Sequence, residues 1–258
     1  YLGDDGTPWK DRNRETWITC RMAHVYSLGL MLGHEGSGEL ADAALKGLKG
    51  ELHDEKNGGW YAGVTPEGGI VPNKQCYAHA FVILAASSAL TAGRPGAKEL
   101  LEEALAVYDR HFWNEEEGLA CDTWNTEFTV LDDYRGLNAN MHTVEAFLAA
   151  GDVTGDKKYH IRAGRIIDHV IQWAEDNSWR IPEHFTKEWV ADLDCNRDRP
   201  DDPFKPYGAT PGHGIEWARL ITQWTLANCG EEKEKLEIHL QAADRKSTRL
   251  NSSHGKLS

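Results

Sequence analysis

The feature of this sequence that most constrains its fold is a recurrent pattern: a polar loop ends, a histidine follows, and an apolar helical run begins. The pattern occurs at His79, His142 and His213, which are 63 and 71 residues apart. A fourth, more distant version lies between Trp17 and His24. Polar helix starts that recur at a nearly regular period are typical of a chain built from repeated structural units.

Helical spacing of apolar residues, interrupted by turns that contain Gly and Pro, divides the chain into helix pairs. The predicted first helices are 15–33, 74–92, 139–151 and one from about 212, and the predicted second helices are 39–50, 97–111, 156–175 and one from about 231. Turn residues followed by short apolar stretches, near Trp60, near Trp124 and over 179–193, predict short strands between the pairs. We therefore expect about four helix pairs with short β-hairpin inserts.

The arrangement of loops indicates how these pairs would assemble. The first helix of each pair follows a long loop and starts with polar, reactive side chains, whereas the second follows a short Gly-rich turn. If the pairs close into a ring, the first helices are inner and the long loops line one mouth. The predicted fold is therefore all-α, an α/α toroid. A solenoid of helix pairs is the alternative, although its repeats are normally shorter and more uniform and carry no strand insert.

Composition excludes several classes of function. The 258 residues carry 40% hydrophobic and 27% charged side chains, which predicts one large globular domain. A formal charge of -13 opposes binding to nucleic acids and to anionic membranes. The five cysteines are an odd number and form no C-x-x-C pair, which argues against a disulfide framework or a thiolate zinc site. These observations predict a cytoplasmic protein.

Both ends of the sequence predict an incomplete protein. The chain starts at Tyr1, with neither an initiator methionine nor a signal segment, and we expect a fragment. From residue 244 an amphipathic helix pattern gives way to a polar string without periodicity, which resembles the translation of a sequencing-library adapter. We therefore predict a partial domain over 1–243 and a non-native tail over 244–258.

Two of the recurrent histidines have a carboxylate one helical turn away. Glu216 follows His213 by three residues, and Glu145 follows His142 in the same way, whereas His79 has no such partner. An imidazole titrates near neutral pH, and a neighbouring carboxylate can hold its tautomer and raise its basicity. A single histidine of this kind is more often structural, but the recurrence favours acid/base catalysis.

The same pairs raise the question of a metal. Facing helices with His and Glu bind di-iron, but the motif in those bundles is Glu-x-x-His with two further glutamates, which is the reverse order. No G-x-G-x-x-G follows a predicted strand, and no P-loop is present. The sequence therefore predicts neither a metal nor an organic cofactor.

Several stretches together resemble the N-acylglucosamine 2-epimerase superfamily, and within it the aldose–ketose isomerase branch that acts on D-mannose or sulfoquinovose. The motifs N-x-N-M-H-x-x-E and P-G-H-x-x-E-W are specific when found in this order, and the resemblance extends from residue 1 to about 228. The stretches that carry it are 17–24, 49–62, 77–84, 133–148, 183–185 and 203–220.

The resemblance implies a fold and a set of residue roles. The fold would be an (α/α)6 barrel with the sugar in its central cavity, incomplete in this sequence. His213 would be one of two acid/base histidines with Glu216 as its supporting carboxylate, and His142 would hold sugar hydroxyls or aid ring opening. The family's second acid/base histidine lies in its final repeat, and neither His239 nor His254 matches it. The implied substrate-binding residues are Arg21, Tyr77, Asn138, Trp17 and Glu145.

The implied reaction is cofactor-independent interconversion of an aldose and a ketose through an enediol, of the D-mannose/D-fructose type, on a monosaccharide. A sulfoquinovose isomerase is less favoured, because we would expect a further arginine where Pro203 and Lys205 stand. The pattern also admits a sugar 2-epimerase of the N-acylglucosamine or cellobiose type, or an inactive fragment that lacks the second histidine. A purely structural helical scaffold would not need reactive side chains at successive helix starts. The sequence predicts no oligomeric state.

Overall fold

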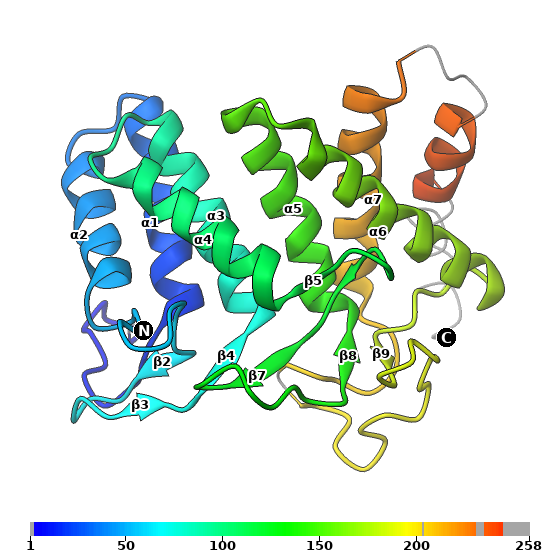
Figure 1. Cartoon of the computed structure of the whole chain (residues 1–258), viewed down its shortest axis with the longest axis horizontal. Coiled ribbons are helices and arrows are strands. Elements are labelled where there is room, and N and C mark those ends of the chain that lie inside the picture. Colours follow the sequence, from blue (N-terminus) through cyan, green and yellow to red (C-terminus); the bar gives the residue numbers. More distant parts are fainter. Residues whose placement is uncertain (1–2, 203, 231–234, 245–258) are drawn as a thin grey trace. The chain divides into compact units, whose positions relative to one another are not determined.

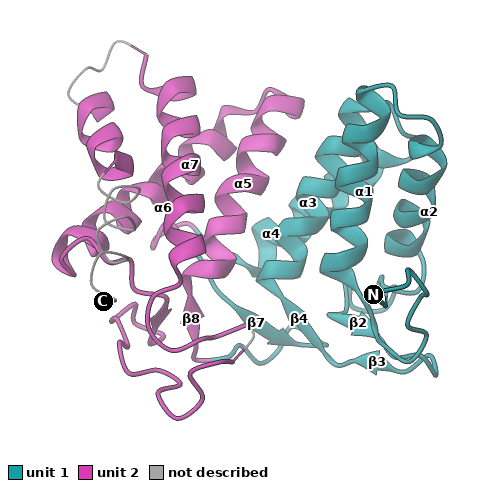
Figure 2. Ribbon diagram, turned by 180° about the vertical axis from the view of Figure 1, so that it is seen from behind, with its two compact units in different colours: residues 1–114, 120–132 teal, residues 115–119, 133–258 magenta. Residues whose placement is uncertain are grey.

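The helices of this chain fall into two units, one formed by 1–114 with 120–132 and the other by 115–119 with 133–258 (Figure 2). The computed structural model describes residues 3–202, 204–230 and 235–244. The predicted tail over 244–258 lies, apart from Asp244, outside the described residues. Its non-native character and the boundary at residue 243 stay predictions.

Unit 1 contains two helix pairs, α1 with α2 and α3 with α4 (Figure 1). Their bounds are α1 Thr16–Met31, α2 Ser37–Lys49, α3 Cys76–Thr91 and α4 Ala97–His111. Helix α3 packs against both α1 and α4. Almost every α3 residue from Cys76 to Ala89 is buried, as expected for a helix that is apolar on all sides.

Unit 2 contains the third pair, α5 Leu137–Thr154 and α6 Lys157–Asp176, followed by α7 Pro211–Asn228. Helix α7 packs against both members of the pair, and residues 235–244 are also helical. The mostly helical class and the order of first and second helices are thus as predicted, although only 235–244 of the helix expected from residue 231 is described. No helix in the described part of the chain has the length and hydropathy needed to cross a membrane.

Short antiparallel ladders join each pair to the loop that follows it. The strand before α1 pairs with the strand after α2, and the same relation holds for the strands that flank the second and third pairs. The strands directly before α1, α3 and α5 were not predicted from the sequence. The bounds are β1 Arg14–Glu15, β2 Gly63–Val64, β3 Ile70–Val71, β4 Asn73–Gln75, β5 Trp113–Asn114, β6 Leu119–Ala120, β7 Thr123–Asn125, β8 Arg135–Gly136 and β9 His184–Phe185.

The same loops cap the first helices. Helices α1, α3 and α5 have no side-chain N-cap, so their first N–H groups need acceptors from elsewhere in the chain. In each case a loop carbonyl accepts the bond: Thr16 N to Ala62 O (3.1 Å), Cys76 N to Asp122 O (2.7 Å) and Leu137 N to Glu183 O (3.0 Å). This repeated bond fixes the loop that carries Glu183 against the start of α5.

One face of α1 is apolar and exposed. The stripe consists of Met22, Val25, Leu28 and Leu32, of which Val25 is 56% and Leu32 is 87% exposed. The spacing of three and four residues places these side chains along one side of the helix. Contiguous exposed apolar surface of this kind favours association.

We expect the double substitution Val25→Gln with Leu28→Gln to shift this chain from associated species toward monomer. Glutamine keeps helix propensity while it removes apolar surface from the stripe, so the helix itself should persist. Sedimentation velocity over a series of protein concentrations measures the change. Val130→Gln is the matched control, because Val130 is 64% exposed on a loop away from α1. Equal sedimentation of the double variant and the control would contradict the prediction.

Candidate active site

Unit 2 brings the two histidines and two glutamates of the predicted pattern into one region with a third glutamate, Glu183. His142 and Glu145 lie in the first turns of α5, and His213 and Glu216 lie in the first turns of α7. The fifth residue, Glu183, immediately precedes β9 and is held beside the start of α5 by the backbone bond described above. These side chains form two histidine–carboxylate pairs.

The first pair is His213 with Glu183. The Nδ1 atom of His213 lies 2.9 Å from Oε2 of Glu183, whose other oxygen accepts a 3.0 Å bond from the backbone N–H of Thr210. The Glu183 side chain is only 6% exposed. Because a carboxylate accepts, Nδ1 of His213 carries the proton, and Nε2 of the neutral ring carries the lone pair. Among the residues that the structure describes, this Nε2 has no hydrogen-bond partner, so it can act as a base.

The environment of His213 tunes its basicity. Partial burial of the ring lowers its pKa, but the hydrogen bond and charge of Glu183, together with the charge of Glu216, outweigh this effect. The pKa of His213 is therefore raised above its ordinary value of 6.5.

Glu216 was predicted to support His213, and the structure corrects this partner. The imidazole bonds Glu183, and Glu216 acts on His213 only through its charge. Oε1 of Glu216 instead lies 3.9 Å from Nδ1 of His142. The spacing of three residues does place His213 and Glu216 near one face of α7, but a buried carboxylate from the loop occupies Nδ1. Glu183 was not predicted as a site residue, although it lies in a stretch, 183–185, that carries the family resemblance.

The second pair is His142 with Glu145, as the spacing predicted. Nδ1 of His142 lies 3.2 Å from Oε2 of Glu145, and Oε1 of Glu145 accepts a 2.8 Å bond from Nη2 of Arg219 on α7. Burial alone would raise the pKa of Glu145, but the bonds and charges of His142 and Arg219 lower it to about 2. Both oxygens of Glu145 are engaged inside the protein, and its predicted contact with a sugar stays a prediction.

Asn138 lies one turn before His142 on α5. Its Oδ1 atom is buried and has no hydrogen-bond partner among the described residues. A buried carbonyl oxygen without a donor costs about 1–3 kcal/mol, so a polar ligand such as a sugar hydroxyl would relieve it. The role of Asn138 in substrate binding stays a prediction.

The remaining predicted binding residues gather in unit 1, at the starts of α1 and α3. Nη2 of Arg21 donates a 3.3 Å bond to the hydroxyl of Tyr77, and the Arg21 guanidinium lies 5.0 Å from the ring centroid of Trp17 and 4.7 Å from that of Phe81. Aromatic rings at these distances attract a cation and restrict its orientation. Arg21 is exposed, so its remaining donors can bind an oxygen.

His79, the third member of the recurrent pattern, is a core residue. Its Nδ1 donates to Gln75 O at 2.7 Å, and its Nε2 accepts from Trp60 N at 3.1 Å. Burial, reinforced by the charges of Lys74 and His111 and opposed by the bond to Gln75, lowers its pKa to about 3. His79 therefore stays neutral, and its two hydrogen bonds tie the backbone at Trp60 to the residue before α3.

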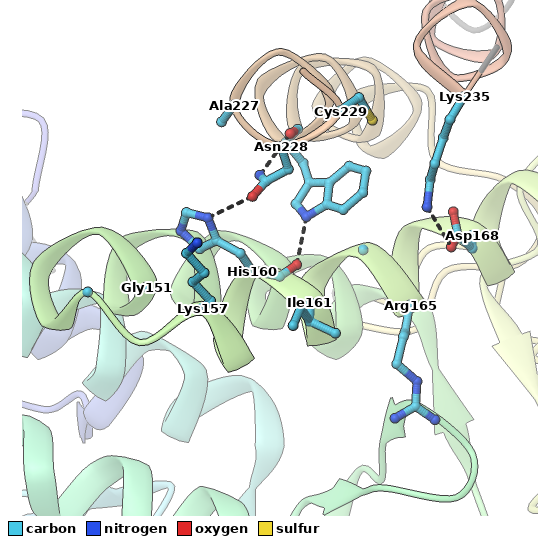
Figure 3. A pocket seen from close by; sticks show the side chains of 13 residues that line it. Gly151, Lys157, His160, Ile161, Arg165, Asp168, Ala227, Asn228, Cys229 and Lys235 are labelled. Carbon is cyan, nitrogen blue, oxygen red and sulfur yellow. Dashed lines mark hydrogen bonds and ion pairs between the residues drawn. The ribbon is translucent and has the colours of Figure 1, made fainter. Parts of the chain in front are cut away.

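A hollow of about 660 Å³ elsewhere in unit 2 is not lined by any of the predicted site residues. It lies beside α6 and α7, and its polar groups bond each other: His160 Nδ1 with Asn228 Oδ1 (3.0 Å), and Lys235 Nζ with Asp168 Oδ2 (3.2 Å) (Figure 3). The candidate active site is thus distinct from this hollow.

Comparison with known proteins identifies the family. The model of the N-acylglucosamine 2-epimerase (GlcNAc 2-epimerase) family matches residues 1–252. The chain belongs to this family. A D-mannose isomerase from Thermobifida fusca is 45% identical over 223 residues, which are 86% of this chain and 55% of that protein.

Two solved structures are similar to this chain in fold. A crystal structure of D-mannose isomerase has a TM-score of 0.83 and 29% sequence identity, and the match covers 95% of this chain and 63% of that one. The cellobiose 2-epimerase of Spirochaeta thermophila has a TM-score of 0.81 at 18% identity, over 96% of this chain and 62% of that one. The chain spans about half the length of the curated relatives it matches.

Proposed function

We propose that this chain is part of a cofactor-independent aldose–ketose isomerase that interconverts D-mannose and D-fructose. Its helix pairs would belong to an (α/α)6 barrel that binds a monosaccharide. The observation that carries the proposal is the fixed His213–Glu183 pair, which leaves a basic Nε2 on a ring with a raised pKa. Membership of the family and the 45% identity to a D-mannose isomerase support the choice of reaction and sugar. The cysteine pattern supports a cytoplasmic location.

His213 would move the carbon-bound proton. In the open-chain aldose, its Nε2 takes the proton from C2, and the electron pair of that bond forms the C1–C2 double bond of an enediolate as the C1 carbonyl oxygen gains charge. Nε2 then returns the proton to C1, and the electron pair on O2 forms the new carbonyl at C2. Movement of the hydroxyl proton from O2 to O1 requires a second acid/base group.

Several further residues would bind and orient the sugar. Asn138 would accept a hydrogen bond from a hydroxyl at its unpaired Oδ1. His142, whose Nδ1 faces Glu145, would hold a sugar hydroxyl or aid ring opening. Arg21, oriented by Tyr77 and Trp17 within unit 1, would bind a sugar oxygen.

The test is turnover of D-mannose in heavy water, followed by NMR, by the 258-residue chain and by a chimera. The chimera joins residues 1–243 to the part of the Thermobifida fusca enzyme that follows its matched segment. We expect fructose with deuterium at C1. The His213→Gln variant should turn over mannose about 10²- to 10⁴-fold more slowly, which is the range for removal of a general base. His34→Gln is the matched control, because His34 is exposed between α1 and α2.

The outcomes separate the candidate reactions. Glucose that accumulates with little ketose would assign a 2-epimerase instead. Turnover of sulfoquinovose but not mannose would assign the sulfonated sugar, and a His213→Gln variant with the wild-type rate would refute the role of His213.

A further inference from the structure

Three side chains of unit 2 that are chemically able to bind a metal face one another across α5 and α7. A ring nitrogen of His142, a carboxylate oxygen of Glu145 and one of Glu216 all lie within 4.8 Å of one another. His142 is buried, whereas Glu145 and Glu216 are partly exposed, so an ion could reach them from solvent. An imidazole with two carboxylates is a donor set suited to zinc-like dications.

The distances are close to those a bound ion needs. Zinc binds imidazole nitrogen and carboxylate oxygen at about 2.0–2.2 Å, so its ligand atoms are separated by roughly 3–3.5 Å in a tetrahedral site. Nδ1 of His142 lies 3.2 Å from Glu145 Oε2 and 3.9 Å from Glu216 Oε1. The Glu216 side chain, which is 29% exposed, would have to move inward to reach the shorter distance.

The charge of the cluster also favours a dication. Two carboxylates and the guanidinium of Arg219 leave one net negative charge beside the His142 ring. Arg219 lies 2.8 Å from Glu145 Oε1 and 3.8 Å from Glu216 Oε1. It therefore competes for Glu216 but leaves Oε2 of Glu145 facing His142. Because Arg219 is 50% exposed, it can turn toward solvent when an ion takes its place.

We propose that His142, Glu145 and Glu216 bind one divalent cation of the zinc type. The guanidinium of Arg219 competes with the cation for the two carboxylates and so weakens its binding. Metal on Nδ1 requires the imidazole proton to move to Nε2, which then can only donate. Bound metal would thus replace the contact with Glu145 that orients His142 for the proposed reaction, and it would inhibit. The binding step does not depend on the proposed function, whereas the inhibition does.

Calorimetric titration of the chelator-treated 258-residue chain with ZnCl₂ tests the binding, and Co²⁺ absorption reports the ligand geometry. We expect one high-affinity ion per chain. Glu216→Gln should weaken binding at least about tenfold, as expected for a lost ligand, and Arg219→Gln should tighten it. Glu175→Gln is the matched control, because Glu175 is an exposed carboxylate on α6 and should not change the affinity.

Glu216→Gln should weaken zinc binding, whereas Arg219→Gln should tighten it. Misfolding cannot explain both results, because a poorly folded variant would not bind more tightly than the wild type. Stoichiometric binding that Glu216→Gln leaves unchanged would place the ion elsewhere and overturn the proposal. So would Arg219→Gln with unchanged or weaker affinity, or the absence of binding. Zinc inhibition of the chimera, increased in Arg219→Gln, would add the functional consequence. Binding without inhibition would sustain the metal site while it refutes the proposed use of His142.

Discussion

Glu183→Gln is expected to lower kcat/KM of the chimera by about 10²- to 10⁴-fold and to move the acid limb of its pH profile to lower pH. Glu183 accepts from both His213 Nδ1 and Thr210 N. An amide has one acceptor oxygen, so it satisfies one of these donors and turns its NH₂ toward the other. Where the NH₂ faces Nδ1, the imidazole proton moves to Nε2 and the base is lost.

The direction of the pH shift follows from the charge of Glu183. A general base must be neutral, and the acid limb of kcat/KM reports its pKa in the free enzyme. In the wild type this limb should lie above pH 6.5, because the pKa of His213 is raised. The substitution removes the carboxylate that raises the pKa but leaves the burial that lowers it, so the limb moves down.

The same pKa shift makes folding depend on pH with a defined sign. Because the folded-state pKa of His213 is above 6.5, its contribution to stability is fully present below pH 6.5 and is lost as pH rises through the folded pKa. Glu183→Gln should flatten this dependence. A loss of function through unfolding alone would change the rate and leave the limb in place.

Two controls separate a positioning role from a general effect of charge. Glu188→Gln removes an exposed carboxylate of the same loop and should change neither the rate nor the limb. Glu183→Asp retains the charge and should keep the limb above pH 6.5 while it lowers the rate. An unshifted limb in Glu183→Gln would refute the assignment of Glu183 as the residue that positions and tunes His213.

The helices were predictable because their signals are local. Helix α4 was predicted at 97–111 and observed at Ala97–His111, since the preceding Gly96 adopts a left-handed conformation (φ 71°) that ends the turn and sets the helix start. Apolar spacing likewise gave the order of first and second helices. The pairing of His142 with Glu145 was predictable for the same reason, because both residues lie on one helix.

The strands and Glu183 were not predictable because their partners are distant in sequence. Strands β1 and β8 have two residues each, too few for an alternating pattern, and only the paired loop defines them. Glu183 reaches His213 across 30 residues, and helical spacing alone favoured Glu216. A single sequence shows which side chains share a helix face, but not which loop residue the fold brings against that face.

Lys74 illustrates the same limit in unit 1, since it was placed at a helix start and lies in β4, fully buried. Its Nζ is 2.8 Å from Oδ2 of Asp54, which is 1% exposed, and also donates to the carbonyl of Gly58. The ammonium lies 4.4 Å from the ring centroid of Phe128. Together these contacts tie the 54–59 turn to the strand that leads into α3.

Asp54→Asn is expected to destabilise unit 1 by about 3–5 kcal/mol, the range for removal of one partner of a buried ion pair. Burial alone would raise the pKa of Asp54, but the bonds from Lys74 and Asn57 lower it far below its ordinary value. The stabilisation is thus present above pH 3.8 and lost as pH falls. In the variant, the amide NH₂ faces the groups that donate to Asp54 in the wild type, such as Lys74 Nζ and Asn57 Nδ2. Lys74 then keeps a buried charge without its counterion.

Urea unfolding followed by tryptophan fluorescence measures the change, because Trp60 lies in the buried loop beside this pair. Asp54→Asn with Lys74→Met should recover part of the lost stability, since the double variant no longer buries an unpaired charge. Glu51→Gln is the control, because its ion pair with Arg14 is 2.6 Å long but exposed on both sides, and its loss should have little effect. Equal effects of Asp54→Asn and Glu51→Gln would show that burial does not determine the strength of the Lys74 pair.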